Sequence, residues 1–300
     1  MGHKEFFLSL SKEGSGLWIR FLLSKKDEAV PSFSISYFDE RGAHGEKRVY
    51  GGGEYVFTED GPIIMGRNEL DLNSNTLTGS LDAGKSEYKI GWSKKEDKIN
   101  AVSGLERILD PRSNYTLLTP LAVFEGYIGH SGNQINVDGY KGMIGYISQP
   151  DYLRKWTWMH MSGSEEDPDM WADVLVTDIR LMGRNVSLLS ARIDGNLIKT
   201  KLMPLTFEGK TYISGIHGDI KVKGENISVD AEAIPKKTIK VKYDAVKRYD
   251  AFCYNSEAAD VSLRYHGRSF TSNSGFFEHG TRENIGGFTE INAERTGDGS

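Results

Sequence analysis

Residues Tyr140 to Met182 read YKGMIGYISQPDYLRKWTWMHMSGSEEDPDMWADVLVTDIRLM and hold three of the five tryptophans of the chain. The run divides into strand-like stretches at Met143–Gln149, Trp156–Met161 and Trp171–Met182. The tract Gly163–Asp169 between the last two is acidic and contains proline, so we expect an exposed loop there. Short strands separated by such breaks are typical of antiparallel β structure.

The middle stretch alternates strictly. Trp156, Trp158 and His160 occupy every second position, and side chains two apart on a strand point to the same face of the sheet. Each of these rings carries an N–H group that needs a partner when buried. Such a row can form the wall of a pocket that holds an apolar ligand and presents one titratable group to it. It can equally form a well-packed strand whose histidine is hydrogen-bonded in the core, and the sequence leaves both readings open.

The same strand rhythm continues on both sides of this region. Strand-like runs start at Leu17–Leu23 and Ser32–Phe38 and recur, between glycine, asparagine and aspartate breaks, as far as Phe270–His279. This spacing predicts antiparallel sheets rather than alternating strands and helices. One run, Ile99–Leu109, has apolar residues near helical spacing and predicts a single short helix that ends before Pro111.

A chain of 300 residues is long enough for two domains. We predict an all-β fold of two antiparallel β-barrels in tandem with one short helix. Residues 1–183 would form the N-terminal barrel and residues 184–300 the C-terminal barrel, with Asp194-Gly195-Asn196 as a hairpin turn soon after the boundary. Closing each sheet removes its edges and leaves a central space that can hold a small ligand.

The composition excludes several classes of partner. A net charge of −5 gives no electrostatic basis for binding nucleic acid. No run approaches the roughly 18 apolar residues of a membrane span, so we expect no integral membrane segment. The single cysteine, Cys253, cannot form an internal disulfide, which favours a reducing compartment and a cytoplasmic location.

The common cofactor and metal motifs are absent from the sequence. The run Gly51-Gly52-Gly53 lies between strand-like segments with no helix after it, so it does not predict a phosphate loop. The seven histidines are scattered without an H-x-x-x-H pair or a cysteine partner. We therefore expect no metal site and no cofactor.

Two further segments carry a resemblance to a known family. Phe124–Gln149 reads FEGYIGHSGNQINVDGYKGMIGYISQ, a glycine-led strand, a hairpin and then G-x-x-G-Y, and the W-T-W-x-H motif follows it. Near the C-terminus, Ser274–Gly280 reads SGFFEHG and places Glu278 on a closing strand. This order resembles the lipocalin-like superfamily of AttH-type proteins, carotenoid hydratases, tocopherol cyclases and fungal Diels–Alderases. The resemblance spans most of the chain and implies two lipocalin-like barrels with an apolar, isoprenoid- or polyketide-like ligand inside or between them.

The chain departs from the hydratases of that family at one place. Those enzymes resemble Y-x-D/E-H-x-W-G after the glycine-tyrosine pair, whereas this chain reads Tyr146-Ile147-Ser148-Gln149-Pro150. Protonating an alkene needs a general acid, which neither Ser148 nor Gln149 supplies. His160 and Glu278 are the remaining candidate proton donors. Each also has a structural reading, His160 as a core residue and Glu278 as a solvated group at a barrel mouth.

These observations favour a protein that binds an apolar small molecule of isoprenoid, lipid or polyketide type, as a carrier or with altered non-redox chemistry. The alternative is a cofactor-free isomerase, cyclase or hydratase that uses acid catalysis and aromatic stabilisation of a cationic transition state. The sequence leaves open whether the protein is an enzyme. The candidate ligand-binding residues are Tyr146, Gln149, Trp156 and Trp158.

Overall fold

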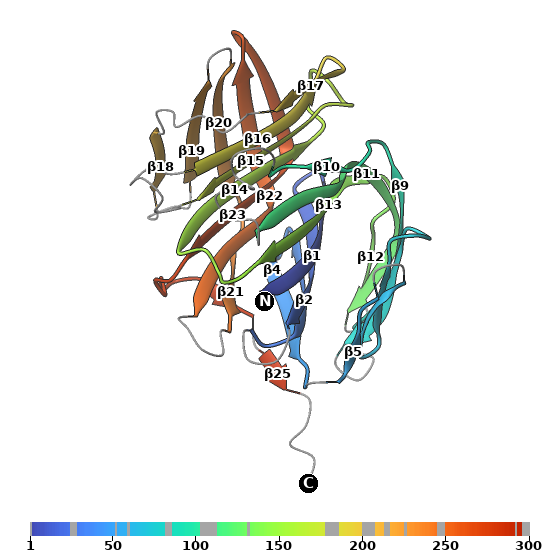
Figure 1. The fold of residues 1–300 in the computed structure, drawn as a ribbon. Helices are drawn as coiled ribbons and strands as arrows, with labels where there is room; N and C mark the ends of the chain where they lie inside the picture. Colours follow the sequence, from blue (N-terminus) through green and yellow to red (C-terminus); the bar gives the residue numbers. More distant parts are fainter. Residues whose placement is uncertain are drawn as a thin grey trace.

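The computed structural model describes residues 2–24, 29–51, 53–58, 61–81, 86–102, 113–130, 133–177, 186–199, 208–212, 217–224, 227–244, 250–291 and 293–295. These residues form strands and turns and contain no helix, and they assemble into two large sheets (Figure 1). The predicted all-β fold is therefore confirmed.

The first sheet collects the N-terminal half of the chain and one returning C-terminal strand. Its order is β25-β4-β3-β2-β1-β13-β11-β9-β8-β7-β6-β5, with β10 and β12 paired to β11. The sheet curls, so that β5, β9 and β12 lie across from β1 and β2 in Figure 1. Its strands are β1 (His3–Lys12), β2 (Ser15–Ser24), β3 (Ser32–Asp39), β4 (Gly42–Val49), β5 (Tyr55–Val56), β6 (Ile63–Met65), β7 (Asn68–Asp71), β8 (Thr76–Leu81), β9 (Ser86–Lys94), β10 (Ile99–Asn100), β11 (Asn114–His130), β12 (Asn133–Asn136), β13 (Tyr140–Gln149) and β25 (Ala293–Arg295).

The second sheet has the order β17-β16-β15-β14-β23-β22-β20-β19-β18, with β21 paired to β22 and β24. Its centre is the long antiparallel hairpin of β22 and β23, against which β14 packs on one side. Its strands are β14 (Lys155–Ser162), β15 (Trp171–Thr177), β16 (Val186–Ile193), β17 (Asn196–Lys199), β18 (Glu208–Tyr212), β19 (His217–Gly224), β20 (Ile227–Pro235), β21 (Ile239–Tyr243), β22 (Ala251–Tyr265), β23 (Arg268–Thr281) and β24 (Thr289–Glu290).

Three apolar cores follow from the alternation of side chains along these strands. On β1, Phe6, Leu8 and Leu10 point into the core that the first sheet curls around. Phe7 points the other way, into a core that residues of both sheets share. A third core lies on the opposite side of the second sheet. We call the shared core the middle layer, because both sheets pack against it.

The segment predicted as a helix starts as a strand. Ile99 and Asn100 form β10 and pair with Leu117 and Thr116 of β11, because the backbone hydrogen bonds of that part of the long strand are otherwise open. Residues 103–112, which make up most of the predicted helix, lie outside the described residues. The described residues include no helix long and apolar enough to cross a membrane.

The turn at Asp194-Gly195-Asn196 is confirmed. Both Asp194 and Gly195 have positive φ angles, 50° and 75°, and Ile193 pairs with Asn196 across the hairpin of β16 and β17. Such a pair of left-handed residues matches the twist of the flanking strands. The domain boundary at residues 183 and 184 falls outside the described residues and stays a prediction, whereas the chain passes from the first sheet to the second between Gln149 and Lys155.

Candidate functional site

The row on β14 lies in the middle layer, as its alternation indicates. Trp156 and Trp158 belong to the shared core, and the centre of the His160 ring lies 6.0 Å from that of Trp158 and 5.6 Å from that of Phe276 on β23. Met159, from the intervening position, belongs to the core on the other side of the sheet. The prediction that the two indoles and the imidazole share a face is therefore confirmed.

Asp173 lies at the centre of a closed hydrogen-bond network beside this row. Its carboxylate accepts hydrogen bonds from the Tyr115 hydroxyl at 2.9 Å and from the Trp158 indole N–H at 2.8 Å. Nδ1 of His160 lies 3.0 Å from the same carboxylate, and Nε2 lies 3.0 Å from the Ser162 hydroxyl. All of these side chains are buried, and His160 has an exposed fraction of 0%. Both ring nitrogens of His160 are thus used inside the core.

The electrostatics of this network favour a structural role. Burial, together with the adjacent Asp173 carboxylate, raises the pKa of Tyr115 well above its ordinary value. Tyr115 therefore keeps its proton and remains a hydrogen-bond donor to Asp173. Because each donor and acceptor here has a partner, the geometry supports the reading of His160 as a hydrogen-bonded core histidine.

Glu278 lies on β23 in the same layer and has different surroundings. Its carboxyl accepts a hydrogen bond from Nε1 of Trp156 at 3.0 Å, and the Tyr243 hydroxyl lies 3.4 Å from the same oxygen. Burial raises the pKa of Glu278, and hydrogen bonds from Cys253 and Trp156 offset this only in part. The side chain keeps some accessible surface although protein surrounds it. Glu278 is therefore an enclosed acid that holds its proton to a higher pH than an ordinary glutamate.

Gly280 is what lets Trp156 reach this position. The two residues are opposite each other on β14 and β23, and an added Cβ at Gly280 would lie 1.9 Å from the indole. The indole therefore packs directly on the backbone of β23. Trp156 also stacks on the Tyr243 ring at 6.1 Å, so its N–H direction toward Glu278 is fixed from two sides.

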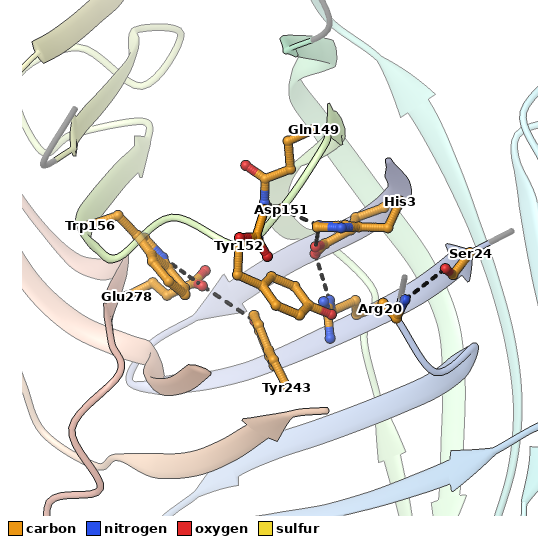
Figure 2. A network of polar contacts seen from close by, with 11 residues as sticks. His3, Arg20, Ser24, Gln149, Asp151, Tyr152, Trp156, Tyr243 and Glu278 are labelled. Carbon is orange, nitrogen blue, oxygen red and sulfur yellow. Dashed lines mark hydrogen bonds and ion pairs between the residues drawn. The ribbon is translucent and has the colours of Figure 1, made fainter. Parts of the chain in front are cut away.

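A buried ion pair lies next to these aromatic rings (Figure 2). Nε of Arg20 donates to Glu5 at 2.7 Å, and Nε2 of His3 lies 2.9 Å from the other Glu5 oxygen. The guanidinium also lies over the face of Tyr243, 3.7 Å from the ring centre. Although burial opposes ionisation, Arg20 and His3 lower the pKa of Glu5 to about 2. Glu5 is therefore ionised at neutral pH. Tyr152 lies beside Arg20 in the same group of side chains (Figure 2).

Gln149 and Tyr146 lie on opposite sides of the first sheet. Gln149 joins the ion-pair group through its side-chain amide, which lies 3.1 Å from Nε2 of His3. Tyr146 packs instead in the inner core of the first sheet, with its ring 4.8 Å from that of Phe6. Residues three apart on a strand face opposite ways, so the expectation that both would lie beside Trp156 was wrong for Tyr146.

Glu257 is a second buried acid of the middle layer. One of its oxygens accepts from Asn255 at 3.0 Å, and burial raises the pKa of this carboxyl well above its ordinary value. It lies within a β-bulge of β22 and packs against Gly16, where an added Cβ would lie 2.1 Å from the Glu257 carbonyl oxygen. Its exposed fraction is 0%, whereas Glu278 keeps some accessible surface.

Sequence reasoning missed Arg20, Glu5, Tyr152, Tyr243 and Asp173. Arg20 had a usable signal, because it is the one charged residue in the apolar strand Leu17–Leu23. A charge in such a strand is buried only when it is paired, which predicts a partner elsewhere in the fold. Nothing in the sequence identifies Glu5 as that partner. In the described part of the chain, no cluster of histidine, cysteine, aspartate and glutamate residues is arranged to hold a metal ion.

No protein-family profile matches the sequence, and no curated protein matches it significantly. Solved structures with the same architecture were found. An AttH-type protein from Nitrosomonas europaea superposes with a TM-score of 0.60 at 10% identity, over 93% of this chain and 92% of that one. The chain has an AttH-like fold.

Two other solved structures share this AttH-like fold. CghA, in its structure with Sch210972, has a TM-score of 0.63 at 10% identity and covers 93% of this chain and 88% of its own. Kievitone hydratase from Nectria haematococca has a TM-score of 0.58 at 12% identity, with coverages of 93% and 88%. Identities this low establish the common architecture only.

Proposed function

We propose that the protein binds an apolar small molecule, of isoprenoid, lipid or polyketide type, in the middle layer beside Glu278. The observation that carries this proposal is an acid with raised pKa and some accessible surface, set among the rings of Trp156, Tyr243 and Tyr152. Aromatic and apolar walls with a few directed polar groups are the usual lining of a small-molecule site. The neighbours support this choice through their shared fold, since one is named a hydratase and another was solved with a small compound.

Acid catalysis on the bound molecule is the second candidate function, and the state of Glu278 favours it. A carboxylic acid with a raised pKa keeps its proton to a higher pH than an ordinary glutamate and can donate that proton to an alkene or carbonyl. The indole of Trp156 and the hydroxyl of Tyr243 would then stabilise the carboxylate left behind. Their ring faces would also stabilise a cationic intermediate, by roughly 0.5–2 kcal/mol for each contact. In this proposal Glu278 is the proton donor and His160 has a structural role.

Mass spectrometry of the small molecules released from the purified protein by denaturation tests the binding proposal. We expect one apolar compound in near-stoichiometric amount, and we expect its recovery to fall strongly in a Trp156→Ala variant, which removes an aromatic wall. Glu87 is exposed on β9, so Glu87→Ala serves as a control that leaves recovery unchanged. If folded wild-type protein releases no such compound and binds none when it is added, the proposal is wrong.

A Glu278→Gln variant tests whether the protein converts its ligand or only carries it. The amide keeps the size and the hydrogen-bond acceptor of the carboxyl but has no proton to transfer at neutral pH. A catalyst would lose about 10²- to 10⁴-fold in turnover of the recovered compound while still binding it. A carrier would return the compound unchanged from both forms.

A further inference from the structure

Two donor atoms of Arg20 are buried without a partner. Its exposed fraction is 1%, and only Nε forms a hydrogen bond, to Glu5. Neither Nη1 nor Nη2 has a hydrogen-bond partner among the described residues. Buried N–H groups of folded proteins are nearly always paired, and a charged donor is the least tolerant of isolation. The pair therefore points to an acceptor that the described side chains do not supply.

The surrounding rings fix the direction of these donors. The Tyr243 face lies against the guanidinium, which holds its plane, while the Glu5 carboxylate occupies the Nε side. Tyr152 lies beside the guanidinium (Figure 2). Nη1 and Nη2 thus form a fork of fixed geometry, which suits an oxygen acceptor.

The local charge selects the kind of acceptor. Ionised Glu5 already neutralises Arg20, since its pKa is lowered to about 2. A second anion would therefore lie close to the Glu5 carboxylate in a poorly solvated place and would be repelled by it. A carbonyl oxygen accepts two hydrogen bonds without adding charge, so it fits the fork better than a carboxylate.

Tyr243 connects this fork to Glu278. Arg20 lies on the face of its ring, and Glu278 lies at its hydroxyl. Building on the proposed function, on which this step rests, we propose that Nη1 and Nη2 of Arg20 bind a carbonyl oxygen of the ligand. The ligand is then an apolar ketone, enone or ester whose carbonyl lies at Arg20 and whose neighbouring carbon atoms lie toward Glu278.

Two fluorescent probes test this assignment. Prodan is an apolar naphthalene dye with a ketone whose emission moves to longer wavelength when the carbonyl accepts hydrogen bonds. Diphenylhexatriene is a hydrocarbon dye without a carbonyl. Arg20→Lys keeps the charge and the pairing with Glu5 but removes the fork, and Arg41→Lys makes the same change at an exposed arginine paired with Asp39. We expect Arg20→Lys to weaken Prodan binding about tenfold and to blue-shift the bound dye, with diphenylhexatriene binding unchanged.

The outcomes separate this inference from the function on which it rests. Should folded wild-type protein bind neither dye, both proposals are overturned. If both dyes bind and Arg20→Lys affects their binding equally or not at all, the middle layer binds apolar molecules but Arg20 does not donate hydrogen bonds to a ligand carbonyl. That result would overturn the inference and leave the proposed function standing. If Arg20→Lys does not fold, the Glu5→Gln/Arg20→Met double variant replaces the ion pair by uncharged groups of similar size. It should show the same selective loss of Prodan.

Discussion

The middle layer contains two polar regions that differ in how completely their hydrogen bonds are satisfied. Around Asp173, each of the groups that Tyr115, Trp158 and His160 present has a partner inside the core. Around Arg20, the terminal guanidinium nitrogens have none among the described residues, and nearby Glu278 keeps accessible surface. Both regions are lined by aromatic rings of the same layer. The two regions therefore have similar residue types and differ in the number of buried polar atoms without a hydrogen-bond partner.

This difference indicates that one region stabilises the fold and the other binds a ligand. A fully satisfied buried network stiffens a core and specifies one arrangement of its strands. A partly satisfied network is unfavourable by itself and is retained where a bound group completes it. We therefore expect changes at Asp173 to act on folding and changes at Arg20 and Glu278 to act on ligands.

The largest effect is expected for Asp173→Ala. The change removes the buried carboxylate that Tyr115, Trp158 and His160 all contact, so we expect a loss of about 3–5 kcal/mol in the free energy of unfolding. Urea denaturation followed by circular dichroism measures it. Asp260→Ala is the control, because Asp260 is a half-exposed partner of Lys236 and its loss should change stability by less than about 1 kcal/mol. Equal effects at the two positions would contradict the closed-network reading.

His160→Gln should have the next largest effect. Glutamine cannot span from Asp173 to Ser162 as the imidazole does, so we expect a loss of about 1–3 kcal/mol in stability. Recovery of the co-purifying ligand should not change. A loss of ligand from a folded His160→Gln protein would instead place His160 in the binding site.

A tryptophan-to-phenylalanine substitution can be made in each of the two regions. Trp158→Phe removes the donor to Asp173, whereas Trp156→Phe removes the donor to Glu278. We expect about 1.5 kcal/mol of lost stability for the first and about 0.5 kcal/mol for the second, because the second acceptor holds its own proton more readily. Only Trp156→Phe should alter ligand binding. Parallel denaturation curves and ligand titrations measure both properties.

The smallest effect is a pH dependence at Glu278. Its pKa is raised in the folded protein, so the folded state keeps a proton that the unfolded state releases above the ordinary value of 4.5. The stability contribution of this group therefore falls as pH rises from 4.5 through the folded pKa. Glu278→Gln lacks this decline, so its stability relative to wild type should increase over that range. Exposed Glu87→Gln should follow the wild-type curve, and parallel curves for all three proteins would mean that the Glu278 pKa is not raised.

Sequence periodicity was sufficient for much of this architecture. The alternation at Trp156, Trp158 and His160 predicted a shared face, and the hairpin at Asp194-Gly195-Asn196 followed from turn chemistry alone. Both are local properties, because a strand has a period of two and a tight turn needs residues that tolerate positive φ. Glu278 was also visible as an acid on a late strand, although its enclosure was not.

The strand content, the two faces of β14 and the presence of a few polar residues within apolar runs follow from the order of residues along the chain. Which of these polar residues come into contact depends on how distant strands pair and pack. Arg20 and Glu5 become partners through the pairing of β1 with β2, and Tyr243 and Glu278 join them from strands far along the chain. Strand pairing depends on residues far apart in the sequence. Tyr146 lies in the inner core of the first sheet, because it is an odd number of positions from Gln149 on β13 and so points to the other face. Burial, which raises the pKa of Glu278 and isolates the Arg20 donors, is likewise a property of two packed sheets and of no single segment.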